Sequence, residues 1–160
     1  MSRKYWLMKS EADCFSFDDL LEAPDQTTYW DGVRNFEVRN MLRDQIKVGD
    51  VVLFYHSNAK PPGIAGIAEV VKAGYPDFTA FDKDNKHFDP KSDPENPTWY
   101  MVDVRAVKKL PRFIGLPELR AQDELSEMAL FRRNRLSITP VERFEFEVIK
   151  KMASKPNQQP

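Results

Sequence analysis

The run Val51-Val-Leu-Phe-Tyr55 is the feature that most constrains how this chain can fold. It is apolar throughout, it has the length of a strand, and it lies between Gly49-Asp50 and the polar residues His56-Ser-Asn58. A short apolar run with such boundaries is typical of a strand buried in a core. The sequence therefore predicts a buried core strand at 51–55.

Further segments have the β-favouring, mostly apolar composition of strands. These segments are Tyr5–Met8, Ile64–Val71, Trp99–Val107 and Arg135–Thr139. Gly66 predicts a bulge or a close backbone approach, and Pro111 is expected to end the strand that begins at Trp99. Because the strands do not alternate regularly with helices, we predict an α+β domain with a small curved or barrel-like sheet and peripheral helices.

Helix starts are predicted from capping patterns. Ser16 with Asp19 forms a capping box before a short helix, and Asn35 is placed to cap a second one. Thr139-Pro-Val-Glu142 combines a cap, a proline at the first helical position and a box glutamate. We expect the helix that follows to turn these residues inward: Phe144, Val148, Ile149 and Met152.

Composition bounds the class of protein. The chain has 160 residues, a formal net charge of -1 and 41% hydrophobic residues, which suits one globular domain. No apolar run approaches the roughly 20 residues of a membrane span, and no secretory signal is evident at the N-terminus. A single cysteine, Cys14, agrees with a reducing compartment, so an intracellular protein is expected.

Charges suggest one candidate surface for an anion. Asp31-Gly32 forms a turn, and in the helix after Asn35 the residues Arg39 and Arg43 lie one turn apart, with Arg34 close by. A phosphate lying across these guanidinium groups would relieve their repulsion. The alternative is a solvated helix face, which is what such charge patterns usually indicate.

Strand ends repeatedly deliver small polar groups beside an aromatic residue. Lys9 and Ser10 follow the first strand, Ser57 and Asn58 follow the buried strand, and Trp30 and Trp99 lie next to a turn and a strand start. A planar ligand held between indole faces and contacted at its edge by polar groups is how proteins grip an extruded nucleobase. Each tryptophan alone could instead be a core aromatic.

Catalytic and metal-binding signatures are absent from the sequence. It has no serine elbow, no paired cysteines and no glycine-rich dinucleotide turn, and His56 and His87 are far apart without a ligand pattern. We therefore expect no metal and no cofactor. Two alternatives to nucleic-acid binding stay open. One is an enzyme using Glu11, Asp13 or His56 as acid or base, and the other is a protein-interaction module built on the acidic loop 75–97.

Several motifs together resemble the EVE domain. They are YWLMKSEAD, WDGVRNFEVRN, GDVVLFYHSN, PGIAGIAEV, YPDFT and RLSITPV, and they extend from about Tyr5 to Ile149. The resemblance implies a PUA-like pseudo-barrel of mixed strands, a relationship to YTH domains, and recognition of modified cytosine in DNA by base flipping. This chain differs from the family pattern at two positions. Ala12 stands where proline is usual, and Glu37 adds an acid to the helix face proposed to contact phosphate.

The resemblance also implies which residues form the site. Trp30 would be the stacking platform, with Trp99 as a second aromatic. The polar wall would consist of Lys9, Ser10, His56, Ser57 and Asn58. Phosphate contacts would come from Arg34, Asn35, Arg39 and Arg43.

The sequence thus predicts a single EVE (PUA-like) domain over 1–153 and a flexible C-terminal tail over 154–160. The predicted function is a non-catalytic, monomeric reader of a modified base in DNA, or alternatively in RNA. The expected location is cytoplasmic in a bacterium and nuclear in a eukaryote.

Overall fold

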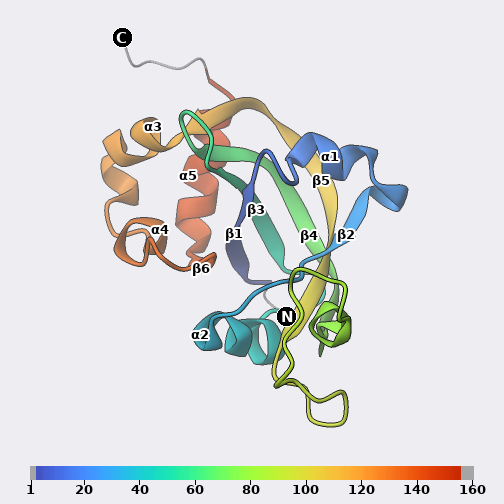
Figure 1. The fold of residues 1–160 in the computed structure, drawn as a ribbon. Coiled ribbons are helices and arrows are strands. Elements are labelled where there is room, and N and C mark those ends of the chain that lie inside the picture. The colour runs from blue at the N-terminus through green and yellow to red at the C-terminus, as the bar shows by residue number, and fades with distance from the viewer. Residues whose placement is uncertain (1–2, 156–160) are drawn as a thin grey trace.

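The structure is a computed structural model that describes residues 3–155. Six strands form one mixed sheet in the order β2-β5-β4-β3-β1-β6, and Figure 1 shows that this sheet is strongly curved. Only β1 and β3 pair in parallel among these neighbours. The strands are β1 (Tyr5–Glu11), β2 (Thr27–Tyr29), β3 (Val51–Ser57), β4 (Gly63–Pro76), β5 (Tyr100–Gly115) and β6 (Ile138–Val141). Within the described residues β2 and β6 are edges, so the predicted α+β class is confirmed but the barrel is not closed.

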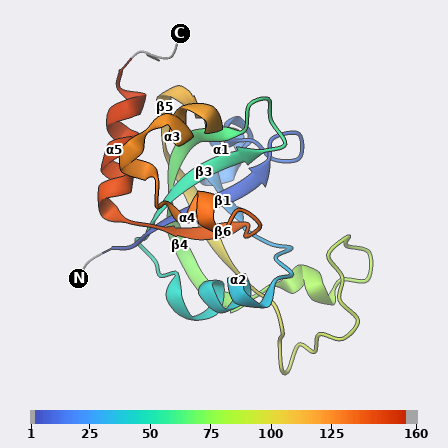
Figure 2. The same ribbon diagram turned by 90° about the vertical axis from the view of Figure 1, so that its left-hand side faces the viewer.

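Helices cover both faces of the sheet. They are α1 (Phe17–Glu22), α2 (Phe36–Asn40), α3 (Leu116–Ala121), α4 (Ala129–Arg132) and α5 (Arg143–Ala153). Figures 1 and 2 show α3, α4 and α5 grouped on one side of the sheet, away from α1 and α2. Shorter helical turns are η1 (Pro24–Gln26), η2 (Met41–Gln45, a π-helix that continues α2), η3 (Phe78–Phe81) and η4 (Asp123–Leu125).

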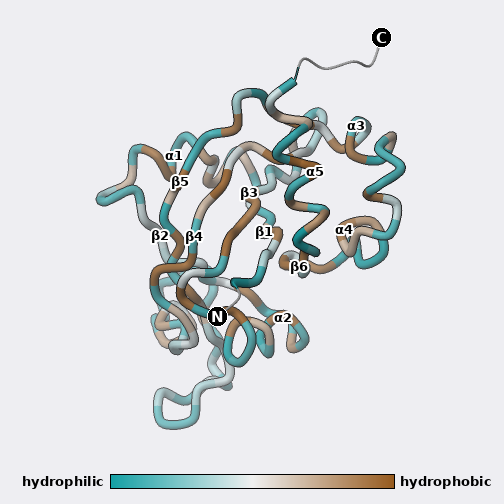
Figure 3. Tube along the Cα trace, turned by 180° about the vertical axis from the view of Figure 1, so that it is seen from behind, coloured by the Kyte–Doolittle hydropathy of each residue, from teal (hydrophilic) through white to brown (hydrophobic). Residues whose placement is uncertain are grey.

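Two apolar clusters form the core, one on each face of the sheet. Alternate residues of β3 divide between them: Val52 and Phe54 join the cluster with α1 and α2, whereas Leu53 and Tyr55 join the cluster with α5. Residues 51–55 are all buried. A strand covered on both faces needs apolar side chains at every position, and this explains the uninterrupted run in the sequence. Figure 3 shows the hydrophobic residues concentrated on the strands.

Two helix starts that were predicted from local capping patterns are confirmed. Ser16 is the N-cap of α1, and its capping box with Asp19 has both hydrogen bonds. Asn35 is the N-cap of α2, where its Oδ1 accepts the backbone N–H of Val38 at 3.0 Å. These caps fix where the residues just after β1 and just after Trp30 enter their helices.

The prediction that Pro111 ends its strand is wrong, because β5 continues to Gly115. The register between β4 and β5 shifts here, so that residues 110–113 lie between the pairs Gly66–Lys109 and Ile64–Ile114. A proline without an N–H is tolerated at such an irregularity. The expected close approach at Gly66 is confirmed, since a Cβ there would lie 2.5 Å from the ring of Phe17.

The predicted start of the C-terminal helix is also wrong. Thr139 and Pro140 pair with β1 as part of β6, and α5 begins at Arg143 with Glu142 as its N-cap. Ile149 and Met152 are buried as predicted, whereas Phe144 is 55% exposed and Val148 is half-buried. The residues of α5 that are buried are Glu145, Phe146, Ile149, Met152 and Ala153.

Residues 77–99, called the projecting segment below, extend from the end of the sheet next to α2 (Figures 1 and 2). The predicted loop over 75–97 is therefore shorter at its start, where β4 continues to Pro76, and it contains η3. No helix within residues 3–155 is long and apolar enough to cross a membrane. Of the predicted tail, residues 156–160 lie outside the described residues.

Candidate base-binding site

Trp30 lies directly after β2, and its side chain packs on the face of the sheet that carries Phe54. Its backbone N–H donates to the carbonyl of Val102 at 2.8 Å, which continues the pairing of β2 with β5. The indole meets the ring of Phe54 edge-on, with centroids 5.5 Å apart, and the residue is 9% exposed. Its small exposed part faces a hollow.

The hollow beside Trp30 has a volume of about 360 Å³ and is open to solvent. Its walls are formed by Phe15, which follows β1, and by the consecutive residues Thr28, Tyr29, Trp30 and Asp31. The size lies within the range of small-ligand pockets. Three aromatic side chains and a carboxylate therefore surround one space.

The predicted polar wall is divided between the two faces of the sheet. Ser10 and His56 lie in register on neighbouring strands, on the face of Phe54. Lys9 lies on the opposite face, where its Nζ is 5.9 Å from the ring centroid of Tyr55 and donates to the carbonyl of Asn134 at 2.8 Å. Burial there lowers the pKa of Lys9. Consecutive strand residues alternate in direction, and this separates residues that are adjacent in the motifs.

Ser57 is the last residue of β3, and Asn58 follows it. Ser57 follows His56 in β3 and so belongs to the face of Tyr55, by the same alternation. Asn58 is exposed and has a left-handed backbone with φ 55°. Neither residue lines the hollow beside Trp30.

Ser10 and His56 hold the connection between β1 and α1. The Ser10 hydroxyl donates to the carbonyl of Phe15 at 2.6 Å, and His56 Nε2 accepts the backbone N–H of Phe17 at 3.0 Å. Burial lowers the pKa of His56, which agrees with a neutral ring whose Nε2 is an acceptor. These two contacts position Phe15 at the wall of the hollow.

Trp99, the predicted second aromatic, belongs to a different and filled region. Its ring stacks on Phe36 with centroids 5.0 Å apart, and the guanidinium of Arg34 lies 5.2 Å from its centroid. The indole N–H donates to Asp89 at 2.6 Å, a bond that lowers the pKa of this carboxyl. Trp99 is only 6% exposed and does not line the hollow.

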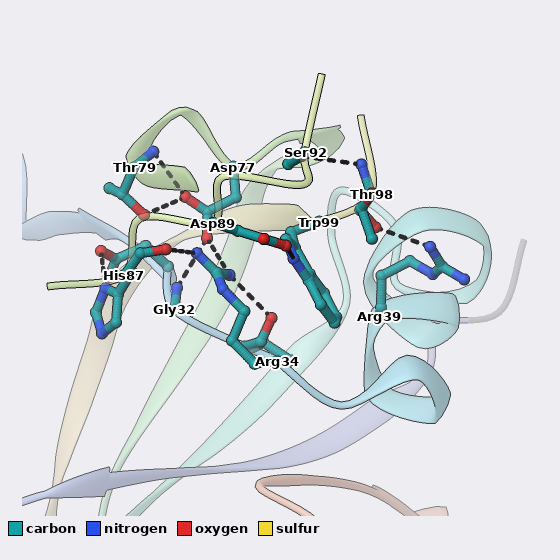
Figure 4. A network of polar contacts seen from close by, with 12 residues as sticks. Gly32, Arg34, Arg39, Asp77, Thr79, His87, Asp89, Ser92, Thr98 and Trp99 are labelled. Atoms are coloured by element: carbon teal, nitrogen blue, oxygen red, sulfur yellow. Dashed lines mark hydrogen bonds and ion pairs between the residues drawn. The ribbon is translucent and has the colours of Figure 1, made fainter. Parts of the chain in front are cut away.

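Arg34 connects the turn after Trp30 to the projecting segment (Figure 4). Its Nη1 donates to Asp77 Oδ2 at 3.1 Å, and its Nη2 donates to the carbonyl of His87 at 2.5 Å. Asp77 is fully buried and also accepts from the backbone N–H of Gly32 and from Thr79. Burial opposes its ionisation, but the hydrogen bonds from Thr79, Gly32 and Arg34 lower the pKa of Asp77 below its usual value.

The other residues predicted to contact phosphate have partners of their own. Asn35 caps α2, and Arg39 donates to the carbonyl of Thr98 at 2.8 Å and to Asn40 (Figure 4). Arg43 forms a bidentate pair with its neighbour Asp44 on the surface, where its side chain is 40% exposed. The geometry therefore favours a structural role for Arg34, Asn35 and Arg39.

Sequence reasoning missed Phe15, Thr28, Tyr29 and Asp31 as lining residues. Asp31 was interpreted only as half of a turn dipeptide. Its position next to Trp30 was a signal that could have identified it, because a turn exposes the groups that flank it. For Phe15 there was no local signal, since its placement depends on Ser10 and on the pairing of β1 with β3.

Two larger hollows lie elsewhere. One, of about 670 Å³, lies beside α5 and is lined by the ion-paired Arg112 and Glu118. Arg112 also donates to the carbonyl of Met152 near the end of α5. The other, of about 680 Å³, lies at the start of β1, where the indole N–H of Trp6 is already bound to Asp50. Within residues 3–155 no group of three His, Cys, Asp or Glu side chains is arranged for a metal.

Comparisons with known proteins decide the family. The EVE domain profile matches residues 4–152. The chain belongs to the EVE domain family. Human thymocyte nuclear protein 1 is 46% identical over 168 residues, which cover 94% of this chain and 74% of that protein.

Solved structures support the same family. A crystal structure of the human THYN1 protein in complex with 5-methylcytosine-containing DNA has a TM-score of 0.92 and 45% identity, covering 96% of this chain and 99% of that one. A hypothetical protein from Leishmania major has a TM-score of 0.90 and 49% identity, covering 96% of both chains. The YTH domain of Zygosaccharomyces rouxii MRB1 has a TM-score of 0.50 at 12% identity, covering 99% and 88%, which shows a shared fold alone.

Proposed function

We propose that this EVE-domain protein is a non-catalytic reader of DNA that accepts a modified cytosine, flipped out of the strand, in the hollow beside Trp30. One observation carries the proposal: an open hollow with an indole and a carboxylate in its wall, in a chain that closely resembles the human THYN1 protein crystallised with 5-methylcytosine-containing DNA. Enzymes and readers that need access to a base take it out of the stack in this way.

The aromatic residues in the wall of the hollow support a planar ligand. Trp30 and Phe15 provide aromatic surface for a base, and stacking contributes about 1–3 kcal/mol per base. Stacking tolerates any base, so selectivity has to come from polar contacts at the edge of the ring and from the room available.

The contacts of His56 support binding over catalysis. His56 is one of the three predicted acid or base candidates, beside Glu11 and Asp13, but its Nε2 accepts the backbone N–H of Phe17. A ring nitrogen engaged in this way has no lone pair for a substrate proton. We therefore propose no enzymatic activity and no cofactor.

The strand backbone requires cations outside the hollow. Of the predicted arginines, we propose Arg43 as a phosphate contact, because it and its partner Asp44 are both exposed to solvent, where a phosphate can replace the carboxylate on the guanidinium. Such a contact positions the strand without reading its sequence.

We further propose that the protein acts as a monomer. The name thymocyte nuclear protein 1 of its relatives supports a nuclear location in a eukaryote, and we propose a cytoplasmic one in a bacterium.

The test measures binding of labelled DNA strands that differ at one position, which is cytosine, 5-methylcytosine or 5-hydroxymethylcytosine. An RNA strand with the same sequence is included, and each strand is measured at two salt concentrations. We expect a preference for a modified cytosine that persists at both salt concentrations. Phe15→Ala should reduce binding about tenfold, because it removes one aromatic wall of the hollow.

Phe144→Ala is the matched control, since Phe144 is an exposed aromatic residue on α5 that does not line the hollow. It should bind like the wild type. If all strands bind with equal affinity, and that affinity falls equally for each as the salt concentration rises, the proposal is contradicted. Binding would then be explained by electrostatic attraction to the phosphate backbone alone. Tighter binding of RNA than of DNA would mean that the ligand of the proposed site is RNA.

A further inference from the structure

Asp31 is the charged residue in the wall of the hollow, and stacking of a base on Trp30 leaves its carboxylate without an assigned contact. Its side chain is 25% exposed, so it is accessible from solvent. Oδ2 lies 3.0 Å from Nδ1 of His87, and Oδ1 has no hydrogen-bond partner among residues 3–155. One oxygen is therefore oriented by the protein while the other remains available to a ligand.

The position of Asp31 is fixed by the projecting segment. His87 is held at its backbone, where the N–H donates to Asn85 Oδ1 at 2.8 Å and the carbonyl accepts from Arg34. Its ring packs directly on Gly32, where a Cβ would come within 2.5 Å of the imidazole. Gly32 also has φ +79°, a conformation that glycine adopts without strain. A side chain at this position would push His87 away from Asp31.

The chemistry of a carboxylate limits what it can recognise. An ionised carboxylate only accepts hydrogen bonds, so it favours a base edge that carries a donor. Cytosine presents an exocyclic amino group at C4, whereas thymine presents an oxygen at the same place. A carboxylate facing that oxygen would meet a second acceptor, and both would lose their hydrogen bonds to water.

We propose that Asp31 selects the flipped base by accepting a hydrogen bond from the cytosine 4-amino group, and that His87 is the positioning residue that orients Asp31. This inference rests on the proposed function, since it assigns the edge contact in the same hollow. It predicts that the protein rejects thymine even though thymine carries the same 5-methyl group as 5-methylcytosine.

The comparison of 5-methylcytosine with thymine isolates this contact, because the methyl group is common to both bases. We measure the affinity of three single strands that are identical except for 5-methylcytosine, cytosine or thymine at one position, at one fixed salt concentration. The wild type should bind the 5-methylcytosine strand at least about tenfold more tightly than the thymine strand. Asp31→Asn should reduce this preference to about threefold or less, because an amide can donate to the thymine oxygen as well as accept from the amino group.

Variants of His87 separate positioning from direct contact. His87→Ala should lower the preference for 5-methylcytosine over thymine by several fold. His87→Asn should restore most of it, because its side-chain amide supplies an N–H close to the position of Nδ1. Thermal unfolding of each variant checks that the fold is kept, which is expected because both side chains are partly exposed.

The outcomes distinguish the two proposals. If Asp31→Asn keeps the full preference for 5-methylcytosine over thymine while Phe15→Ala weakens binding, the edge contact is wrong and the reader function stands. If the wild type binds all three strands equally or binds none, both the edge contact and the reader function fail.

Discussion

Trp30 and Trp99 differ in what surrounds them, although both are nearly buried, at 9% and 6% exposed. Trp99 is stacked on Phe36, faces the guanidinium of Arg34 and donates its indole N–H to Asp89. Trp30 meets the edge of Phe54 and borders an open hollow. Buried fraction alone therefore does not identify a ligand platform. What distinguishes the two residues is whether their neighbours already fill and satisfy the ring.

The projecting segment, which ends at Trp99, is connected to the turn that follows Trp30. The projecting segment is tied to the turn at Gly32 and Arg34 through the fully buried Asp77. The same segment carries His87 to Asp31. The filled region is thus a support, and its arginines serve this support rather than a ligand.

The largest effect is expected from breaking that support at Asp77. Asp77→Ala would leave the guanidinium of Arg34 and the N–H of Gly32 without their acceptor. We expect the free energy of unfolding to fall by about 3–5 kcal/mol, as when one partner of a buried pair is removed. Urea denaturation measures this change.

Asp89→Ala is the control for Asp77→Ala. Asp89 is partly exposed and accepts hydrogen bonds from the indole N–H of Trp99 and from the backbone N–H of Lys91, so its removal should cost about 1–3 kcal/mol, less than the removal of Asp77. Equal losses for the two variants would mean that Asp77 is not the centre of the support.

A smaller effect is expected from the arginines in strand binding. Arg43→Gln should lower the slope of log affinity against log salt by about one unit for every DNA strand alike, as expected for one lost phosphate contact. Because Arg39 is bound to the carbonyl of Thr98, Arg39→Gln should leave that slope unchanged. A lower slope for Arg39→Gln and an unchanged slope for Arg43→Gln would mean that Arg39, and not Arg43, contacts phosphate.

The smallest effect is a pH dependence that comes from His56. Its pKa in the folded protein lies below the ordinary value of 6.5, because it is buried. Its contribution to stability is therefore complete above pH 6.5 and declines as the pH falls from 6.5 towards the lower pKa of the folded state. Thermal unfolding measured from pH 7.5 down to 5.0 should show this decline.

His56→Gln tests the assignment of this pH dependence. The amide oxygen of glutamine can accept the N–H of Phe17 but does not titrate. The variant should lose stability less steeply than the wild type over the same pH range. An unchanged pH profile would assign the dependence to another group.

The sequence predicted those parts of the fold that depend on neighbouring residues. The buried strand at 51–55, the capping box of Ser16 and the cap at Asn35 all follow from local patterns, and the structure confirms them. Pro111 and the start of α5 were predicted wrongly because pairing with a distant strand decides them. Pro111 lies at a register shift against β4, and Thr139 is held by Leu7 of β1.

The site was predictable only in part, for the same reason. Trp30 was found because it stands beside a turn in a distinctive motif. Lys9 and Ser10 lie on opposite faces of β1. Which of the two faces the hollow depends on the core cluster that covers each face of the sheet. The contact between Asp31 and His87 joins residues 56 positions apart, so no local pattern reveals it.

The stacking role of Trp30 is tested most directly by comparing Trp30→Leu with Trp99→Leu in binding 5-methylcytosine-containing DNA. Both variants are measured at a temperature at which thermal unfolding shows that they are folded. We predict that Trp30→Leu weakens binding by about 1–3 kcal/mol, the contribution of stacking on one base, whereas Trp99→Leu is less stable but binds like the wild type. Binding that survives in Trp30→Leu and is lost in Trp99→Leu would mean that Trp99, and not Trp30, is the stacking platform.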